Sequence, residues 1–159
     1  MGTLKYASPV GDIFISAQNG FITELYFDGG ITTPKGLQES IPNTDDANVL
    51  HLLIQELDAY FAGGLKKFTV PLKPTGTPFR MKVWEALQTI PYGETISYKQ
   101  LAERIHNPAA IRAVGGANHH NPISIIIPCH RVIGANGKLV GYGGGIDAKE
   151  FLLIHEKKH

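Results

Sequence analysis

The chain has 159 residues and a formal net charge of +1, with 15 Lys and Arg against 14 Asp and Glu. This length fits one compact domain or two small domains that share an interface. No apolar run approaches the roughly 18 residues that cross a membrane, and the first residues lack the apolar segment of a signal peptide. A single cysteine excludes an internal disulfide and a multi-thiolate zinc site. We therefore expect a cytoplasmic protein.

The charges are unevenly distributed along the chain. Residues 1–77 contain 5 Lys and Arg against 8 Asp and Glu, whereas residues 78–159 contain 10 against 6, together with 6 of the 7 histidines. A polyanion would therefore face the second half. An excess of this size is also common on an ordinary solvated surface, so the charge alone does not decide between the two.

The first half has the pattern of a small α/β domain. Short apolar runs separated by Gly, Asn and Pro turns predict strands over 4–7, 13–17 and 22–27. A segment rich in Gly, Pro and Thr predicts a loop over 29–43, and apolar residues at helical spacing predict a helix over 47–61. We expect one more strand over 68–72 and a linker over 73–77. The predicted domains are residues 1–77 and 78–159.

The second half begins with the signals of a helix-turn-helix. Thr77 and Pro78 are suited to the cap and first position of a helix that buries Phe79, Val83, Trp84, Leu87 and Ile90. Ser97 and Gln100 form a capping box for a short helix over 98–105. The pair 107–108 (Asn-Pro) predicts the start of a second helix that ends near 118. Two short helices joined by a tight turn are typical of a helix-turn-helix.

The remaining elements complete a winged-helix pattern. Three isoleucines predict a buried strand over 125–127, which Pro128 would end. The segment 135–138 (Ala-Asn-Gly-Lys) is typical of a hairpin turn, which would form the wing. A glycine-rich loop over 141–145 and a closing helix over 148–157 follow. The predicted fold class is therefore α/β, with an N-terminal α/β domain and a C-terminal winged helix-turn-helix domain.

Cys129 is the strongest candidate for a chemical role. A lone cysteine is more often a small buried apolar residue, but this one precedes His130 and Arg131 directly. A thiol with a pKa near 8.5 is only about 3% thiolate at pH 7, so a nucleophile needs a base or a nearby cation. His130 is the candidate base, acting through a bend at Pro128 or a bridging water, and Glu156 is a candidate carboxylate to orient the imidazole. From the residues alone, His130 is equally well explained as an ordinary hydrogen-bonded histidine, and Glu156 is better explained as a solvated carboxylate at a helix end.

The second helix of the motif carries two glycines late in its length. Gly115 and Gly116 each cost roughly 1 kcal/mol relative to alanine, so another backbone must come close to them. Packing against a neighbouring helix is one explanation. Entry of a slim helix surface into a DNA groove is the other, with Arg112 as its one long cation.

These segments together resemble one family. Residues 128–133 (Pro-Cys-His-Arg-Val-Ile) are similar to the active-site signature of the O6-alkylguanine-DNA alkyltransferases. Residues 90–98 (Ile-Pro-Tyr-Gly-Glu-Thr-Ile-Ser-Tyr), 112–117 (Arg-Ala-Val-Gly-Gly-Ala), 121–122 and 149–153 extend the resemblance over residues 78–156. The family's N-terminal unit resembles a ribonuclease-H-like fold, which is the fold that the resemblance implies for residues 1–77.

The resemblance implies single-use repair of double-stranded DNA containing O6-alkylguanine, and possible action on O4-alkylthymine, by a monomer without cofactor or metal. Cys129 would accept the alkyl group, through a relay of Glu156, His130 and a water, from a base that is flipped out of the duplex. Tyr98 would donate to guanine N3, and Asn121 would tie the helix-turn-helix to the active-site turn. Arg112 would fill the gap left by the flipped nucleotide. The remaining expected contacts are Ser97, Ala113, Gly115 and Gly116 on the DNA side and Val132, Tyr142 and Gly143 on the substrate side, with main-chain groups of Cys129, Val132 and Gly143 on the guanine edge.

The sequence departs from the family pattern at two positions, and two other functions remain as alternatives. Gly143 stands where some members have serine and Ser124 where some have proline, which suggests a looser pocket that admits bulkier alkyl groups. The alternative functions are a non-catalytic winged-helix or lesion-binding DNA module and a cysteine hydrolase that uses Cys129 and His130.

Overall fold

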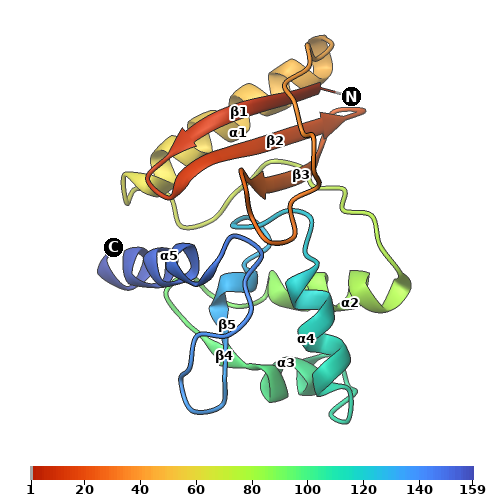
Figure 1. Ribbon diagram of the computed structural model, residues 1–159, viewed down its shortest axis with the longest axis vertical. Coiled ribbons are helices and arrows are strands. Elements are labelled where there is room, and N and C mark those ends of the chain that lie inside the picture. Colours follow the sequence, from red (N-terminus) through yellow and green to blue (C-terminus); the bar gives the residue numbers. More distant parts are fainter. Residues whose placement is uncertain (1) are drawn as a thin grey trace.

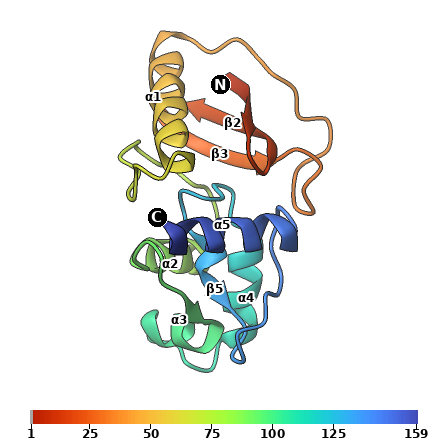
Figure 2. The ribbon, with the colours of Figure 1, turned by 90° about the vertical axis from the view of Figure 1, so that its left-hand side faces the viewer.

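The computed structural model describes residues 2–159, and its N-terminal half is built on a three-stranded antiparallel sheet. The strands are β1 (Gly2–Ser8), β2 (Gly11–Gln18) and β3 (Phe21–Phe27), in that order across the sheet. Helix α1 (Thr44–Phe61) covers one face (Figures 1 and 2). The Asn43 side chain caps α1 by accepting a hydrogen bond from the Asp46 N–H at 2.8 Å. These elements confirm the predicted strands, loop and helix of the first half.

The predicted strand over 68–72 is wrong. Only Leu72 forms a bridge, which is parallel and pairs with Ile22 of β3. The Thr69 and Val70 N–H groups donate to the Glu56 carboxylate instead of to a strand, and Pro71 has no N–H to donate. The Glu56 carboxylate of α1 therefore takes the place of the backbone hydrogen bonds to a neighbouring strand that the apolar pattern suggested.

The C-terminal half consists of short elements around one buried centre. Helices α2 (Pro78–Leu87), α3 (Tyr98–Arg104) and α4 (Ile111–His119) form the helix-turn-helix region, and α5 (Ile146–Lys158) closes the domain. Both the Thr77 cap and the Ser97–Gln100 capping box are present, as predicted. The Trp84 indole N–H donates to Ala117 O at 2.9 Å and fixes α2 against α4.

The second helix of the motif starts later than predicted. Asn107 accepts a backbone hydrogen bond from Ala110 within a turn, and α4 begins only at Ile111, with no side-chain cap. His106 has a φ of 59°, so the chain leaves α3 through a left-handed residue that requires this extra turn. The predicted Asn107 cap is therefore wrong.

One further prediction fails near the cysteine. Residues 125–127 form a turn rather than a strand, because Ile125 has a φ of 73°, although all three isoleucines are buried. Cys129–Arg131 form a short 3-10 helix, η1, and Val132–Ile133 form β5. The hairpin turn is present, with Gly134 N–H donating to Lys138 O at 2.8 Å, but β5 pairs in parallel with β4 (Ile96–Ser97). The wing is consequently a turn and loop without a second strand among the described residues.

The segment 122–128, which precedes Cys129 and is called the active-site turn below, covers the β3 edge of the N-terminal sheet. Leu25 of β3 donates to Pro122 O at 2.8 Å and accepts from Ser124 N–H at 3.2 Å, so Ile123 bridges Leu25 in parallel. A covered edge cannot pair with another chain. The two domains thus share backbone hydrogen bonds at the segment that leads to Cys129.

Candidate active site and DNA-binding face

Cys129 lies at the first position of η1 and is only 3% exposed. Its N–H donates to Ile127 O at 2.8 Å, which fixes the backbone of the turn. Burial raises the pKa of the thiol to about 11, although the Asn121 side chain and the positive charge of Lys149 oppose the rise. The thiol is therefore protonated at neutral pH, and nucleophilic attack requires a base to remove its proton.

Asn121 holds the turn that presents the thiol. Its Nδ2 donates to Ile127 O at 2.7 Å, and its Oδ1 accepts from Ile123 N–H at 3.0 Å. These bonds close the turn of three isoleucines from inside, where the amide is 2% exposed. The geometry places Asn121 between the end of α4 and the active-site turn.

His130, which follows Cys129 in the chain, forms a buried pair with Glu156 of α5. The His130 Nε2 atom lies 2.7 Å from Glu156 Oε2, and the His130 side chain is fully buried. A carboxylate on Nε2 keeps the proton on that nitrogen, so Nδ1 is the free base. Nδ1 is itself buried without a protein partner, which suits a proton acceptor. Burial lowers the pKa of His130, so the imidazole is neutral at pH 7 and able to accept a proton.

Glu156 is held by more than the histidine. The Arg131 Nε donates to Glu156 Oε1 at 2.8 Å, its Nη2 donates to Oε2 at 3.0 Å, and its Nη1 donates to Ile90 O at 2.7 Å. Tyr60 of α1 donates its hydroxyl to Oε2 at 2.7 Å. Burial would raise the pKa of Glu156, but the hydrogen bonds from His130 and Arg131 and the charge of Arg131 outweigh burial and lower it well below its usual range. Glu156 therefore stays ionised and orients the imidazole.

Tyr98, Val140 and Lys149 form a second polar group beside the thiol. The Tyr98 hydroxyl donates to Val140 O at 3.1 Å, and the buried Lys149 Nζ donates to the same carbonyl at 2.9 Å. Burial lowers the pKa of Lys149 to about 8, whereas the nearby Cys129 opposes this change. Burial and the nearby Cys129 raise the pKa of Tyr98, so its hydroxyl remains a proton donor.

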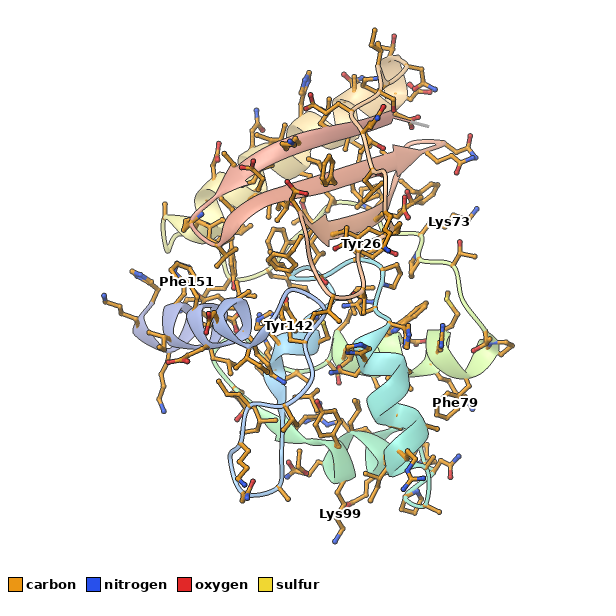
Figure 3. The ribbon with its side chains drawn as sticks, in the orientation of Figure 1. Tyr26, Lys73, Phe79, Lys99, Tyr142 and Phe151 are labelled. Carbon is orange, nitrogen blue, oxygen red and sulfur yellow. The ribbon has the colours of Figure 1, made fainter. Side chains whose placement is uncertain are left out.

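The N-terminal domain braces the loop over 141–145. Ile31 N–H donates to Gly143 O at 2.7 Å, and a side chain at position 143 would collide with the Thr32 hydroxyl. Tyr142 is buried in the seam between the domains, with its ring 5.7 Å from that of Phe27 (Figure 3). A serine at position 143 would therefore press on the N-terminal loop as well as on the pocket.

The exposed surface of α4 carries the small residues and the cation. Arg112, Ala113 and Gly116 are exposed, and Gly115 is half-buried. A methyl group at Gly116 would meet no atom within 4 Å, and one at Gly115 would meet only the Tyr98 ring at 3.8 Å. Packing within the protein therefore does not require these glycines. Ser97, the cap of α3, is half-buried, and its hydroxyl accepts from Gln100 N–H.

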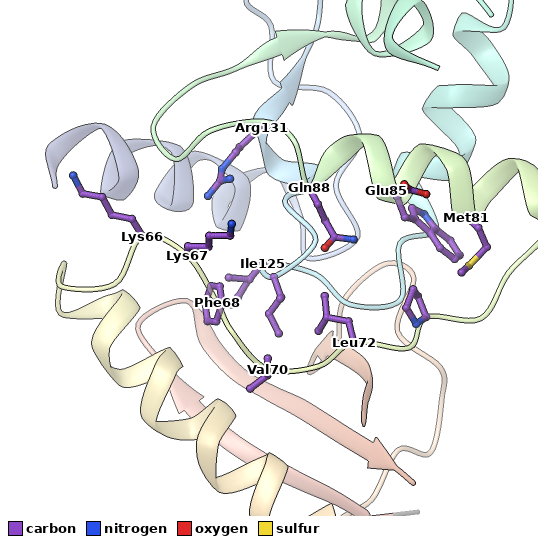
Figure 4. Close-up of a pocket in the computed structure, with 13 residues that line it drawn as sticks. Lys66, Lys67, Phe68, Val70, Leu72, Met81, Glu85, Gln88, Ile125 and Arg131 are labelled. Atoms are coloured by element: carbon purple, nitrogen blue, oxygen red, sulfur yellow. The ribbon is translucent and has the colours of Figure 1, made fainter. Parts of the chain in front are cut away.

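A cavity of about 430 Å³ lies at the domain seam, behind the active-site turn (Figure 4). Its lining includes Lys66, Lys67, Ile125 and Arg131, but it does not include Cys129. No group of three or more His, Cys, Asp or Glu side chains within residues 2–159 could hold a metal ion. No helix in this part of the chain is long and apolar enough to span a bilayer.

Four residues of the site were not predicted. Asn118 donates to Cys129 O at 3.3 Å, Arg131 and Tyr60 hold Glu156, and Lys149 lies near the thiol. Arg131 could have been found, because it follows Cys129 and His130 directly. Tyr60 carried no signal, since it reads as an ordinary core residue of α1.

The fold and the site together define a class of protein that joins a helix-turn-helix region to a buried cysteine, which is followed by a histidine paired with a buried carboxylate. The ribonuclease-like domain model of the 6-O-methylguanine DNA methyltransferases matches residues 3–74, and their DNA-binding domain model matches residues 78–158. The chain belongs to this family.

Curated relatives and solved structures agree with this assignment. The chain is 48% identical over 150 residues to the methylated-DNA–protein-cysteine methyltransferase of Mycobacterium tuberculosis (strain H37Rv), covering 94% of this chain and 88% of the relative. It is 48% identical over 151 residues to the protein of the same name from Methanosarcina acetivorans, covering 93% of each. The crystal structure of Mycobacterium tuberculosis OGT in complex with DNA superposes with a TM-score of 0.87 at 46% identity, covering 97% of this chain and 91% of that one.

Proposed function

We propose that this protein repairs double-stranded DNA by moving an alkyl group from guanine O6 to Cys129, once per molecule. The observation that carries the proposal is the buried set of Cys129, His130 and Glu156 in one turn and one helix, next to the exposed small-residue surface of α4. Family membership and the names of the relatives support it. O4-alkylthymine is a second candidate substrate of the same site.

Each step of the proposed reaction is assigned to particular residues of the site. The thiol proton passes to His130 Nδ1 through a water, the S–C bond forms as the C–O6 bond breaks, and the electron pair stays on the purine. The guanine anion then takes a proton, so that the net reaction moves one alkyl group from O6 to sulfur and one proton from sulfur to guanine. Tyr98 donates its hydroxyl to guanine N3 while negative charge grows on the base. Asn121 holds the turn that presents the thiol.

Substrate binding requires the base to leave the duplex. A thiol buried in a turn cannot approach a stacked guanine in line, and extrusion of the base costs a few kcal/mol. Arg112 occupies the gap in the duplex, while Ala113, Gly115 and Gly116 let the groove approach α4, and Ser97 contacts the backbone. Val132, Tyr142 and Gly143 line the guanine. The Cys129 carbonyl already accepts from Asn118 Nδ2 and from Val132 N–H, so a guanine that bonds this carbonyl displaces the Asn118 side chain.

The proposal also assigns an organisation to the chain. Residues 1–77 form the N-terminal domain and residues 78–159 the domain that binds DNA and accepts the alkyl group. The protein acts as a monomer, without a cofactor, in the cytoplasm, where bacterial and archaeal DNA is found.

Mass measurement tests the proposal directly. The protein is incubated with a duplex containing O6-methylguanine, and the Cys129 peptide is expected to gain one methyl group, which Cys129→Ala abolishes. One equivalent of DNA should saturate the protein. DNA binding without a mass gain would support a lesion-binding module, and turnover beyond one equivalent would support a cysteine hydrolase.

A further inference from the structure

The last turn of α1 reaches across the domain seam to the carboxylate of the relay. Figures 1 and 2 show the C-terminal end of α1 beside α5. There the Tyr60 hydroxyl donates to Glu156 Oε2 at 2.7 Å, and the Tyr60 carbonyl accepts from His155 Nε2 at 2.7 Å. One residue of the N-terminal domain therefore bonds two consecutive residues of α5 and fixes their register.

The Tyr60 hydroxyl and the His130 imidazole share one oxygen atom. Glu156 Oε2 accepts from Tyr60, from Arg131 Nη2 at 3.0 Å and from His130 Nε2 at 2.7 Å. Each additional donor withdraws negative charge from that oxygen and weakens it as a partner for a protonated imidazole. The strength of the Tyr60 hydrogen bond therefore influences how readily His130 holds a second proton.

The surroundings of Tyr60 keep it in the donor role. Its ring is 1% exposed and packs against Phe68, Tyr92 and His155. Burial and the negative charge of Glu156 raise its pKa, so the hydroxyl does not ionise at any physiological pH. The other titratable groups that face His130 and Glu156 are Cys129, Arg131 and Lys149, together with Tyr92 and Tyr142.

We propose that Tyr60 is a positioning residue of the alkyl-transfer relay, through which the N-terminal domain sets the pH range in which Cys129 reacts. This inference rests on the proposed function. It gives the N-terminal domain a part in the chemistry, because the hydroxyl acts on Glu156, Glu156 acts on His130, and His130 takes the thiol proton.

Two replacements of Tyr60 are expected to act in opposite directions. Tyr60→Phe removes the hydroxyl and keeps the ring, so Glu156 stabilises the protonated His130 better and the pKa of His130 rises. The acid limb, which is the part of the pH profile where the rate falls as His130 becomes protonated, therefore moves to higher pH by roughly half a unit. A 3-fluorotyrosine at position 60 is a more acidic donor, so it moves the limb down. The measurement is the single-turnover rate constant for methyl transfer from an O6-methylguanine duplex, across pH. At neutral pH, Tyr60→Phe is expected to slow transfer by less than about twofold, because the acid limb still lies below pH 7, and the difference should grow to about threefold in the acid limb itself.

Tyr6→Phe is the matched control. Tyr6 also belongs to the N-terminal domain and donates to a carboxylate, Asp58 Oδ1, at 2.6 Å, but this pair is exposed and neither residue hydrogen-bonds His130 or Glu156. Its loss should leave the acid limb unchanged. Imidazole NMR titration of His130 in folded Tyr60→Phe protein gives the same answer independently of rate.

The outcomes separate the two proposals. An acid limb and a His130 titration that are unchanged in both Tyr60 variants overturn the role of Tyr60, while methyl transfer by the unmodified protein still stands. Shifts in the same direction for both variants indicate a purely structural role and also overturn it. Absence of methyl transfer in the unmodified protein overturns the proposed function itself.

Discussion

The exposed face of α4 and the buried relay differ in almost every physical respect, although both belong to the C-terminal domain. Arg112, Ala113 and Gly116 face solvent and have few neighbours, whereas Cys129, His130 and Glu156 are all nearly inaccessible. A buried ion pair is sensitive to loss of one partner, and an exposed cation contributes little to folding. Removing a partner in the relay should therefore alter both rate and stability, while changes on α4 should act on DNA affinity without weakening the fold.

Glu156→Gln should give the largest effect. The neutral amide leaves the buried Arg131 guanidinium without a counter-charge, so we expect a loss of about 3 kcal/mol in the free energy of unfolding. The rate of methyl transfer should fall by about 10²-fold or more, because the imidazole loses its orienting charge. Urea unfolding and single-turnover rates measure both quantities.

Glu150→Gln is the matched control for this prediction. Glu150 is exposed on the same helix, and its replacement should change the stability by less than about 0.5 kcal/mol. If both variants lost the same free energy of unfolding, the buried Arg131–Glu156 pair would not be a major contributor to stability.

The pH dependence should be the next largest effect. Transfer needs a neutral His130, whose pKa burial lowers below its ordinary 6.5. The rate constant should thus be nearly independent of pH around neutrality and fall roughly tenfold per unit below a midpoint that lies under pH 6.5. DNA affinity is measured in parallel, because His119 and His120 lie at the end of α4. A midpoint at or above pH 6.5 would contradict a buried neutral imidazole as the base.

Arg112→Ala should change affinity without changing stability. Losing the one long cation of this surface should weaken DNA binding about tenfold and reduce the salt slope by about one. Lys5→Ala removes the same charge from β1, which lies in the other domain, and should leave binding unchanged. Fluorescence titrations at several salt concentrations distinguish the two variants, and equal slopes would remove Arg112 from the DNA-binding surface.

Gly116→Ala should give the smallest effect, and it should change stability and DNA affinity in opposite directions. Open space surrounds the position, so the new methyl group should stabilise the helix by about 0.5–1 kcal/mol. DNA affinity should nevertheless fall by a few-fold, because the groove approaches the backbone there. Thermal unfolding and DNA titration of the same sample check both signs, and a more stable protein with unchanged affinity would refute close approach at this position.

The accuracy of prediction followed the range of the interactions. The strands over 4–7, 13–17 and 22–27 were predicted well because alternation and turn residues are local signals. The segment over 125–127 was mispredicted because an apolar run fits a strand and a buried turn equally well. The left-handed Ile125 depends on Asn121 and on the edge of β3, neither of which a local pattern contains.

The sequence by itself determined the two-part α/β organisation and the caps of α2 and α3, and it made Cys129 the candidate nucleophile with His130 as its candidate base. Only the tertiary structure decided that His130 Nε2 meets Glu156, that Arg131 and Tyr60 hold the carboxylate, and that Asn118 and Lys149 lie beside the thiol. The reason is physical. Caps and periodic patterns depend on residues within a few positions of one another, whereas Tyr60 and Glu156 are 96 residues apart and meet only because the two domains dock.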